Sequence, residues 1–346
     1  MNQSLHMPDS SSNHQPLPPK DFILVTGSTG LIGNELIRQL LQKGFSVKAV
    51  YNKTPLPVND NKNLYPISCD LLDVVTLEEA MENVSAVYHC AGLVSFSPKK
   101  TKELYYSNVV CTANVVNACL SAGVKKLVQV SSVAAMGRNK ESASINESMQ
   151  WSKETNPSKY ARSKHLAEME VWRGVAEGLE AAIVNPTIIL GAGKWENGST
   201  AIFKNVYNEF RWYSNGVNGF VDVRDVCKAM ICLMESNVTG ERFIISAENK
   251  RYQDLFNLIA DTFKKKRPSW KVTPLLAQLV WRWEWLKMQF SKKDPLITKE
   301  TAATALAASY YDNTKFKKAF PDFKYYSLEE TIEHTCKTLQ QKLNIP

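Results

Sequence analysis

The chain has 346 residues, 44% of them hydrophobic, which is enough for one large or two modest domains with a sizeable core. Its net charge of +8 is spread along the sequence, with one basic run at 264–267, a pattern that favours a solvated helix end over a nucleic-acid surface. Seven cysteines without a Cys-x-x-Cys pair argue against a disulfide framework and a zinc site, and no stretch reaches the roughly 18 apolar residues of a membrane helix.

Residues 1–20 are rich in serine, asparagine, histidine and proline, and they lack the apolar core of a signal peptide. Such a composition predicts a disordered tail, because too little apolar surface is present to offset the entropy of ordering. Together with the missing membrane span, this predicts a soluble, cytoplasmic protein.

The first structured stretch carries three glycines at a fixed spacing. An apolar run over 22–26 is followed by Gly27, Gly30 and Gly33, and then by a helix-period pattern. Gly27 permits a tight turn, Gly30 lets the backbone approach a ligand, and Gly33 lets the helix pack on the strand. The free N–H groups of the helix start favour a pyrophosphate. We therefore expect a dinucleotide to be bound here, by Gly27, Thr29, Gly30, Leu31 and Ile32.

Apolar runs and helix-period segments alternate from this point to residue 248. This alternation predicts a doubly wound parallel sheet of the Rossmann type, an α/β fold that binds ligands beyond the carboxyl ends of its strands. The predicted strands are 22–26, 46–51, 64–68, 86–90, 127–130, 181–184 and 242–246. The predicted helices are 31–43, 76–82, 102–122, 157–178 and 224–236.

Residues that follow the strands bear on the choice of coenzyme. After the second strand the chain offers Asn52 and Lys53 and no carboxylate for a ribose hydroxyl, so a 2′-phosphate, and hence NADP, is favoured over NAD. Asp70, followed by Leu71, is suited to accept a hydrogen bond from the adenine amino group. The small residues Cys90, Ala91 and Gly92 would let the backbone lie against the coenzyme.

A serine pair and a Tyr-x-x-x-Lys pattern supply candidate chemistry. Ser131 and Ser132 end the fifth strand, and Tyr160 and Lys164 share one face of the predicted helix 157–178. A neighbouring ammonium would lower the pKa of the phenol, which is ordinarily near 10, so that Tyr160 could exchange a proton with an alcohol or carbonyl. Ser132 would hold the substrate oxygen. Ser131, Tyr160 and Lys164 are expected to contact the coenzyme as well, with Lys164 reaching the nicotinamide ribose.

These motifs, taken together, resemble the extended short-chain dehydrogenases/reductases. The resemblance covers nearly the whole chain after the tail, and its signature residues are Thr26-Gly27-x-x-Gly30-x-x-Gly33, Asp70-Leu71, His89-x-Ala91-Gly92, Asn108, Ser131-Ser132, Tyr160-x-x-x-Lys164, Asn185-Pro186-Thr187 and Phe220-Val-Asp222-Val-Arg224-Asp225-Val. It implies that Ser132, Tyr160 and Lys164 are catalytic and that Asn108 supports the active site.

The resemblance also implies roles for other segments. Asn185, Pro186 and Thr187 would lie near the nicotinamide. Residues 222–225 would have a scaffold role, although Asp225 could equally be a simple helix cap. Helices 102–122 and 157–178 would pair with their copies in a homodimer. The segment 184–191 is similar to the dihydroflavonol-reductase and 3-beta-hydroxysteroid-dehydrogenase branch. The residues after Ser132 contain no carboxylate for water elimination, which argues against a dehydratase.

The remaining segments are assigned to a second lobe. We expect residues 21–191 plus 220–248 to form the coenzyme-binding domain, and 192–219 plus 249–346 to form a smaller, mostly helical substrate lobe. Residues 210–213 could line a pocket for an aromatic or alicyclic substrate, or simply pack the lobes together. The tryptophan-rich segment 275–290 is predicted to be a buried helix or a lid, in preference to a membrane-surface helix.

Three functions remain open. The favoured one is an NAD(P)-dependent oxidoreductase that interconverts an alcohol and a carbonyl on a small molecule, with Tyr160 as general acid and base. The alternatives are a nucleotide-sugar epimerase with tightly bound NAD and a non-catalytic dinucleotide-binding sensor. The complete Ser132, Tyr160 and Lys164 set argues against the sensor, because a pure binder has no need of a proton relay.

Overall fold

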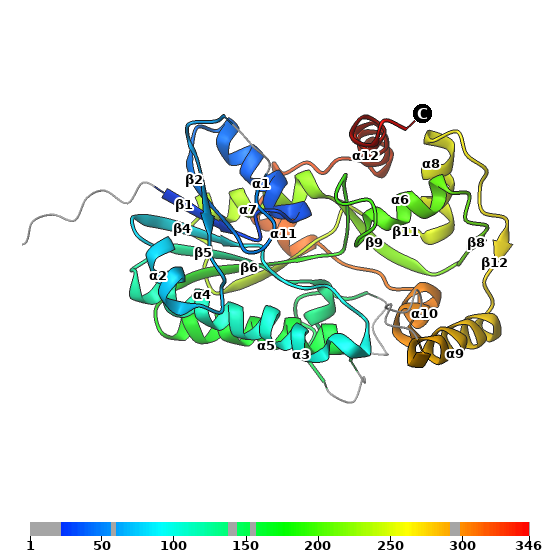
Figure 1. Cartoon of the computed structure of the whole chain (residues 1–346), viewed down its shortest axis with the longest axis horizontal. Helices are drawn as coiled ribbons and strands as arrows, with labels where there is room; N and C mark the ends of the chain where they lie inside the picture. Colours follow the sequence, from blue (N-terminus) through cyan, green and yellow to red (C-terminus); the bar gives the residue numbers. More distant parts are fainter. Residues whose placement is uncertain (1–21, 57–59, 138–143, 153–156, 291–297, 346) are drawn as a thin grey trace, which may run out of the picture.

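A computed structural model describes residues 22–56, 60–137, 144–152, 157–290 and 298–345, and Figure 1 shows its arrangement. The predicted tail lies outside these residues. The central element is a seven-stranded parallel sheet in the order β10-β6-β5-β4-β1-β2-β3. Its strands are β1 (Phe22–Thr26), β2 (Ser46–Tyr51), β3 (Leu64–Ser68), β4 (Val84–His89), β5 (Lys126–Val130), β6 (Glu180–Pro186) and β10 (Glu241–Ile245). All seven predicted strands are present, within two residues at either end.

Helices cover both faces of this sheet, which confirms the predicted Rossmann architecture. The helices around it are α1 (Leu31–Gln42), α2 (Val74–Ala80), α3 (Thr101–Leu104), α4 (Cys111–Ser121), α5 (Lys159–Ala176) and α7 (Val223–Glu235). One core joins α1 and α7 to the sheet, and a second joins α2, α4 and α5 to its other face. Both cores form because strand residues alternate between faces, so Val25 enters the first and Leu24 the second.

The predicted helix 102–122 is not a uniform α-helix. Between α3 and α4 the chain forms a π-helix, η2 (Tyr105–Val110), which contains the buried Asn108. A π-helix inserts residues into the α-helical ladder and often lies at a functional site. Periodicity alone does not reveal it, because the apolar pattern continues through the segment.

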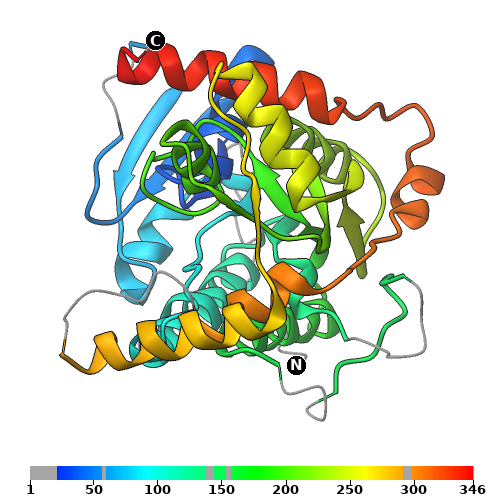
Figure 2. The same cartoon turned by 90° about the vertical axis from the view of Figure 1, so that its right-hand side faces the viewer.

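The C-terminal region forms a smaller lobe with its own core, as the right-hand side of Figure 1 and the face shown in Figure 2 make clear. Its helices are α6 (Thr200–Tyr207), α8 (Tyr252–Thr262), α9 (Pro274–Phe290), α10 (Lys299–Leu306) and α12 (Leu328–Leu343), whereas α11 (Thr314–Ala319) packs on the first core through Phe316. The lobe is mostly helical, as predicted. The exact domain boundaries stay a prediction.

Short strands that the sequence did not predict form two further small sheets, β11-β9-β7 and β12-β8. They are β7 (Ile188–Leu190), β8 (Trp212–Tyr213), β9 (Val217–Asp222), β11 (Glu248–Arg251) and β12 (Trp270–Lys271). β9 pairs with β7 in parallel and with β11 in antiparallel orientation. Most of these strands are too short for a period-2 pattern to be read, so only long-range pairing defines them.

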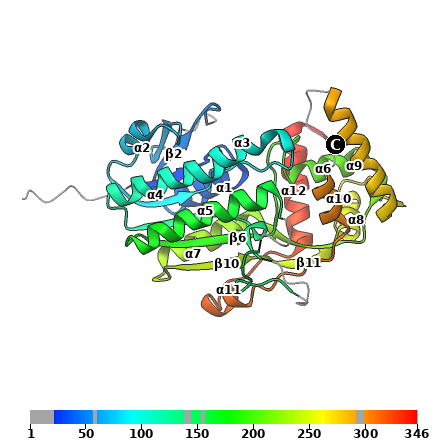
Figure 3. The ribbon, with the colours of Figure 1, turned by 90° about the horizontal axis from the view of Figure 1, so that it is seen from below.

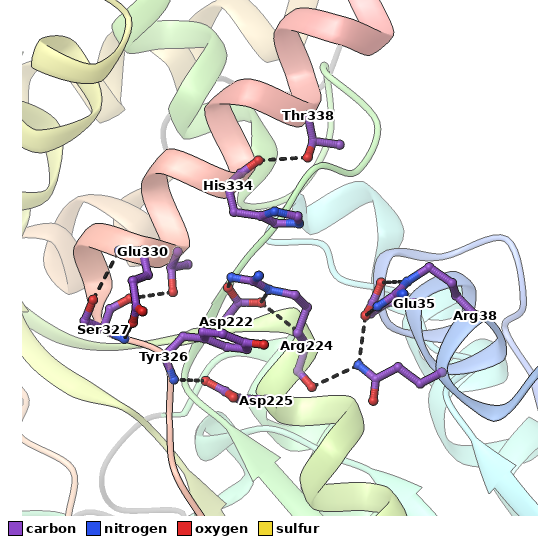
Figure 4. A network of polar contacts seen from close by, with 12 residues as sticks. Glu35, Arg38, Asp222, Arg224, Asp225, Tyr326, Ser327, Glu330, His334 and Thr338 are labelled. Atoms are coloured by element: carbon purple, nitrogen blue, oxygen red, sulfur yellow. Dashed lines mark hydrogen bonds and ion pairs between the residues drawn. The ribbon is translucent and has the colours of Figure 1, made fainter. Parts of the chain in front are cut away.

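A polar network ties the C-terminal segment to α7 and α1 (Figure 4). Asp222 caps α7 by accepting a hydrogen bond from the Arg224 backbone nitrogen at 2.7 Å, and it also pairs with the Arg224 guanidinium. That guanidinium lies 3.9 Å from the centre of the Tyr326 ring. The reading of Asp225 as the cap is wrong, because its carboxylate instead accepts from the Tyr326 backbone nitrogen at 2.8 Å. The scaffold role of 222–225 fits this geometry.

We expect Asp225 to make stability depend on pH. Burial raises its pKa from 3.8 to about 7, so the folded protein holds a proton that the unfolded chain releases near pH 4. Stability should therefore fall as pH rises from about 4 to about 7, by about 1–2 kcal/mol. Asp225→Asn should lose this slope in urea denaturation series, whereas Asp322→Asn, at an exposed position, should keep it. Equal slopes in both variants would contradict the assignment.

Candidate active site

The candidate site lies along the carboxyl ends of the parallel strands. β1 pairs with β2 on one side and with β4 on the other, so the strand order reverses between β1 and β4, where ligands bind in such sheets. The residues predicted to bind the coenzyme follow β1, β2, β3, β4 and β5 or end β6. Their roles stay predictions, and the contacts below describe what the fold brings together.

The glycine turn packs so closely on neighbouring backbone that it has no room for a side chain. Gly27 has a φ of +67°, and a β-carbon at this position would lie 2.6 Å from the Ala91 nitrogen. A β-carbon at Gly33 would lie 2.3 Å from the Gly27 carbonyl oxygen. The start of α1 at Gly30 has no side-chain cap, so its first N–H groups are available to a phosphate. This cradle fits a dinucleotide.

Replacing Gly27 tests the cradle directly. Gly27→Ala should push the turn away from Ala91 and lower affinity for the nicotinamide coenzyme about tenfold or more, because the backbone leaves its position under the pyrophosphate. Gly44→Ala is the matched control: Gly44 has a φ of +85° but nothing within 4 Å of the added carbon. Coenzyme titration by fluorescence should separate the two. Equal affinities would contradict the predicted site.

The predicted adenosine side is open to solvent. Asn52 and Lys53 follow β2 and are both exposed. Asp70 is also exposed, and its side chain accepts from the Leu72 nitrogen at 3.0 Å. The carbonyl oxygen of Leu71 accepts from the Asn114 side chain at 2.8 Å, which fixes this loop on α4.

A buried hydrogen-bond chain under the site was not predicted. His89 lies 2.6 Å from the Thr26 hydroxyl and 3.1 Å from the Thr112 hydroxyl, which in turn donates to the Asn108 carbonyl oxygen. Burial lowers the pKa of His89 to about 3, so the ring is neutral. Since Thr112 donates onward, His89 donates through Nε2 and accepts through Nδ1. The chain joins β1, β4 and the π-helix rigidly beneath the crevice.

Asn108 holds two neighbouring elements together. Its side chain accepts from the Leu93 nitrogen at 2.7 Å and donates to the Leu93 carbonyl and the Ser163 hydroxyl. Ser163 donates to the Tyr160 carbonyl oxygen. Asn108 thus links the loop after β4 to the first turn of α5, the helix that carries Tyr160 and Lys164.

The predicted catalytic residues converge at the end of β5. The side chain of Ser132 lies near that of Tyr160 and acts to lower the pKa of the phenol. Ser132 also accepts from the Ala134 nitrogen at 3.1 Å. Lys164 donates to the Val130 carbonyl oxygen at 2.8 Å, and its ammonium would lie 3.7 Å from a β-carbon placed on Gly92. Tyr160 and Lys164 are 8% and 5% exposed.

The pKa of Tyr160, beside Lys164, differs from the prediction. Burial raises the pKa of Tyr160, and the nearby Ser132 side chain only partly opposes this, so the predicted lowering is wrong for the chain by itself. Burial likewise lowers the pKa of Lys164 to about 8, with Glu168 acting in the opposite direction. Desolvation outweighs attraction for both groups because neither charge is exposed to water.

The residues at the end of β6 mostly face inward. The Asn185 side chain donates to the Ser132 carbonyl at 3.0 Å and to Glu168 at 2.6 Å. Pro186 is buried, and Thr187 bonds to Ser246. Glu168, fully buried, also pairs with Arg242 at 3.1 Å. Sequence reasoning missed Glu168, although its position one turn after Lys164 was a readable signal. The Ser131 hydroxyl, also buried, has no partner among the described residues.

An aromatic-lined pocket adjoins the predicted catalytic residues. It has a volume of about 250 Å³ and is bordered by Phe96, Pro98, Trp281 and Trp285 together with Ser97, Thr101, Lys159, Thr298, Lys299 and Glu300. The Phe96 ring contacts the Tyr160 ring edge-on, at 5.5 Å between centres. The residues at 210–213 are not among its lining; Trp212 instead contacts Trp270 at 5.0 Å.

The tryptophan-rich helix α9 is not buried in a core. Leu275, Trp283 and Trp285 are 75%, 61% and 52% exposed, so the predicted burial is wrong. The helix closes one side of the pocket instead, which agrees with the lid reading. Among the described residues, no helix combines the length and apolarity needed to cross a bilayer, and no group of three or more His, Cys, Asp or Glu residues could hold a metal ion.

The fold and the site define the class: a Rossmann protein with a glycine-rich turn and a Ser, Tyr and Lys set at the carboxyl ends of its strands. The chain belongs to the NAD dependent epimerase/dehydratase family, whose sequence model matches residues 23–246. The resemblance to the extended short-chain dehydrogenases/reductases is thereby confirmed.

Three relatives are similar over most of the chain, and two of them have reductase names. The chain is 30% identical over 260 residues to sterol demethylase protein B of Methylococcus capsulatus, which covers 74% of this chain and 78% of the relative. It is 28% identical to a putative dihydroflavonol 4-reductase of Synechocystis over 85% of this chain and 88% of the relative. Cinnamoyl-CoA reductase 1 of Petunia hybrida is 28% identical, with 70% and 77% covered.

Solved structures share the fold along nearly the whole chain. The crystal structure of gox2253 superposes with a TM-score of 0.80 and 27% identity, covering 94% of this chain and 100% of the other. UDP-glucose 4-epimerase from Thermotoga maritima superposes with a TM-score of 0.74 at 21% identity, covering 93% and 99%, a likeness of fold alone.

Proposed function

We propose that this protein is an NAD(P)-dependent oxidoreductase that interconverts an alcohol and a carbonyl on a small, apolar ring-containing molecule. The observation that carries the proposal is the convergence of Ser132, Tyr160 and the buried Lys164 at the end of β5, next to the glycine turn. A hydroxyl pair with a cation one helical turn away is suited to proton exchange with a substrate oxygen. Family membership and the reductase names of several relatives support the same reaction class.

The roles of the residues follow from their groups. When bound, the nicotinamide coenzyme would supply the hydride for reduction or accept it in oxidation. In reduction, Tyr160 gives its phenolic proton to the carbonyl oxygen while Ser132 donates a hydrogen bond to that oxygen. The Lys164 ammonium stabilises the phenolate that remains until solvent returns a proton. Asn108 keeps the Tyr160 backbone in position through Ser163.

The pocket indicates the substrate class. Phe96, Trp281 and Trp285 offer aromatic faces to a molecule in the pocket. Because Phe96 contacts the Tyr160 ring, a substrate bound between Phe96 and the two tryptophans would present its oxygen near the phenol. Sterols and dihydroflavonols, for which two relatives are named, are both molecules with fused rings. A pocket of about 250 Å³ would enclose part of such a ring system and leave the rest at the entrance.

NADP is the proposed coenzyme, because the exposed Asn52 and Lys53 after β2 provide no carboxylate and one cation. Lys53→Ala should weaken NADPH binding about tenfold and leave NADH binding unchanged, since only NADPH carries the 2′-phosphate. Lys62→Ala, at another exposed lysine, is the control and should change neither. Coenzyme titrations measure both affinities. Equal loss for the two coenzymes would contradict the NADP assignment.

We also propose that the protein is a homodimer in the cytoplasm. α4 and α5 lie side by side on the outside of the sheet domain (Figure 3). Met169 of α5 is 42% exposed, and Tyr105 and Tyr106 of η2, which leads into α4, are 49% and 43% exposed. Pairing of this surface with its copy would cover these apolar groups. Sedimentation velocity of the wild type and of Met169→Lys tests the pairing.

The function is tested by following nicotinamide absorbance with a panel of ketones, aldehydes and sugar nucleotides, using NADH and NADPH. Steady NADPH consumption with a ring ketone or aldehyde is the expected result. Conversion of a sugar nucleotide with coenzyme retained and no net absorbance change would instead identify an epimerase. Coenzyme binding without turnover of any compound would favour a sensor, and absence of coenzyme binding would overturn the proposal.

A further inference from the structure

The exposed side of α9 carries a continuous apolar stripe. Leu275, Leu279, Trp283 and Leu286 are 75%, 58%, 61% and 45% exposed, and they follow each other at intervals of four, four and three residues. At 100° per residue these four side chains fall on one face of the helix. The exposed leucines and the tryptophan aligned in this way form one contiguous apolar patch on the surface.

The rest of the helix explains why this face is left outside. α9 packs against α10, and Ala277 is buried on that side with Glu284 close to buried. Trp281 and Trp285 border the aromatic pocket. Three sides of the helix thus have distinct surroundings: a packed side, a pocket side and the apolar stripe. Packing among the residues that the structure describes does not require the stripe.

Cations border the stripe and the nearby pocket. Arg282 and Lys287 lie on the two sides of the stripe, Lys287 in an ion pair with Glu284 at 2.9 Å. Lys159 and Lys299 are exposed at the pocket, where Glu300 is the one carboxylate among the described lining residues. The net charge of the chain is +8. Tryptophan and leucine on one face with basic residues beside them are typical of helices that lie in the surface of a membrane containing anionic lipids.

The size of the stripe disfavours a second copy of the chain as its partner. Eleven residues of helix span about 17 Å, so the stripe covers on the order of 200 Å². A stable dimer buries about 800 Å² on each partner. A membrane needs no such area, because a few side chains inserted at the headgroup level, together with attraction between charges, give reversible binding.

We propose that α9 docks this protein on an anionic lipid bilayer through Leu275, Leu279, Trp283 and Leu286. The pocket bordered by Trp281 and Trp285 then lies directly beside the bilayer surface. A lipophilic substrate could pass from the lipid into the pocket without crossing water. The docking itself does not depend on the proposed reaction.

Vesicle sedimentation tests the docking with the full chain. The wild type should bind vesicles of phosphatidylcholine mixed with phosphatidylglycerol, bind pure phosphatidylcholine less, and be released by salt. The double variant L279S/W283S should lower the partition coefficient about tenfold or more. V74S/V75S, which alters two residues of α2 that are 48% and 65% exposed at the far end of the molecule (Figure 1), should bind like the wild type.

Several results would overturn the proposal. They are failure of the wild type to bind the mixed vesicles, equal loss of binding in both double variants, and conversion of a wild-type dimer into a monomer by L279S/W283S, which would make the stripe an interface between copies. Should L279S/W283S melt earlier than the wild type, Leu275→Ser at the most exposed position replaces it. Turnover of a water-soluble carbonyl compound should be the same in L279S/W283S and wild type, so failed docking and failed catalysis are distinguishable.

Discussion

Tyr160→Phe should lower kcat about 100-fold or more and leave coenzyme affinity unchanged. The substitution keeps the ring, and with it the contact with Phe96 at 5.5 Å, so the packing of α5 is preserved. It removes the hydroxyl that lies near Ser132, and with it the proposed proton donor. The expected loss is the usual contribution of a general acid. Steady-state rates and coenzyme titrations on the same preparation measure both quantities.

The control for this experiment is Tyr310→Phe, which removes a hydroxyl from a tyrosine that is 45% exposed. Its rate and affinity should match the wild type. Unchanged turnover in Tyr160→Phe would show that another group transfers the proton. A loss of coenzyme binding in the same variant would show that the hydroxyl positions the coenzyme, and the assigned role would then be wrong.

Glu168→Ala should lower the free energy of unfolding by about 3 kcal/mol. The carboxylate is fully buried, and it accepts from Asn185 at 2.6 Å and pairs with Arg242 at 3.1 Å. Its removal leaves the mostly buried Arg242 guanidinium with only the carbonyl oxygens of Glu147 and Met149. An unpaired buried charge destabilises the folded state by much more than the intact ion pair stabilises it. The expected loss of unfolding free energy is therefore large.

The matched control lies two residues further along the same helix. Glu170 pairs with Arg173 at 3.0 Å, but both side chains are partly exposed, so Glu170→Ala should cost less than about 0.5 kcal/mol. Urea denaturation of both variants measures the difference. Equal stabilities would contradict the structural role of Glu168. Because Asn185 also bonds to the Ser132 carbonyl, Glu168→Ala should reduce kcat as well, with Glu168→Gln partly restoring it.

The sequence by itself determined the sheet domain and the location of the site. β1, β2 and β3 have the predicted bounds, because each is an apolar run ended by turn residues, and that signal is local. The glycine turn and the Tyr160 and Lys164 pair were readable for the same reason, since the spacing of a few residues fixes their geometry. Family membership confirms the class to which these patterns pointed.

Only the tertiary structure decided what surrounds these motifs. Whether α9 is buried depends on which elements pack against it. Its apolar residues are distributed around the helix, so its own pattern does not predict which side is buried. The Thr26, His89 and Thr112 chain, the Glu168 and Arg242 pair and the contact of Phe96 with Tyr160 all join residues distant in sequence. The pKa of Tyr160 also depends on the tertiary structure. The spacing of four residues predicted a neighbouring cation that would lower this pKa, but burial by the whole fold raises it.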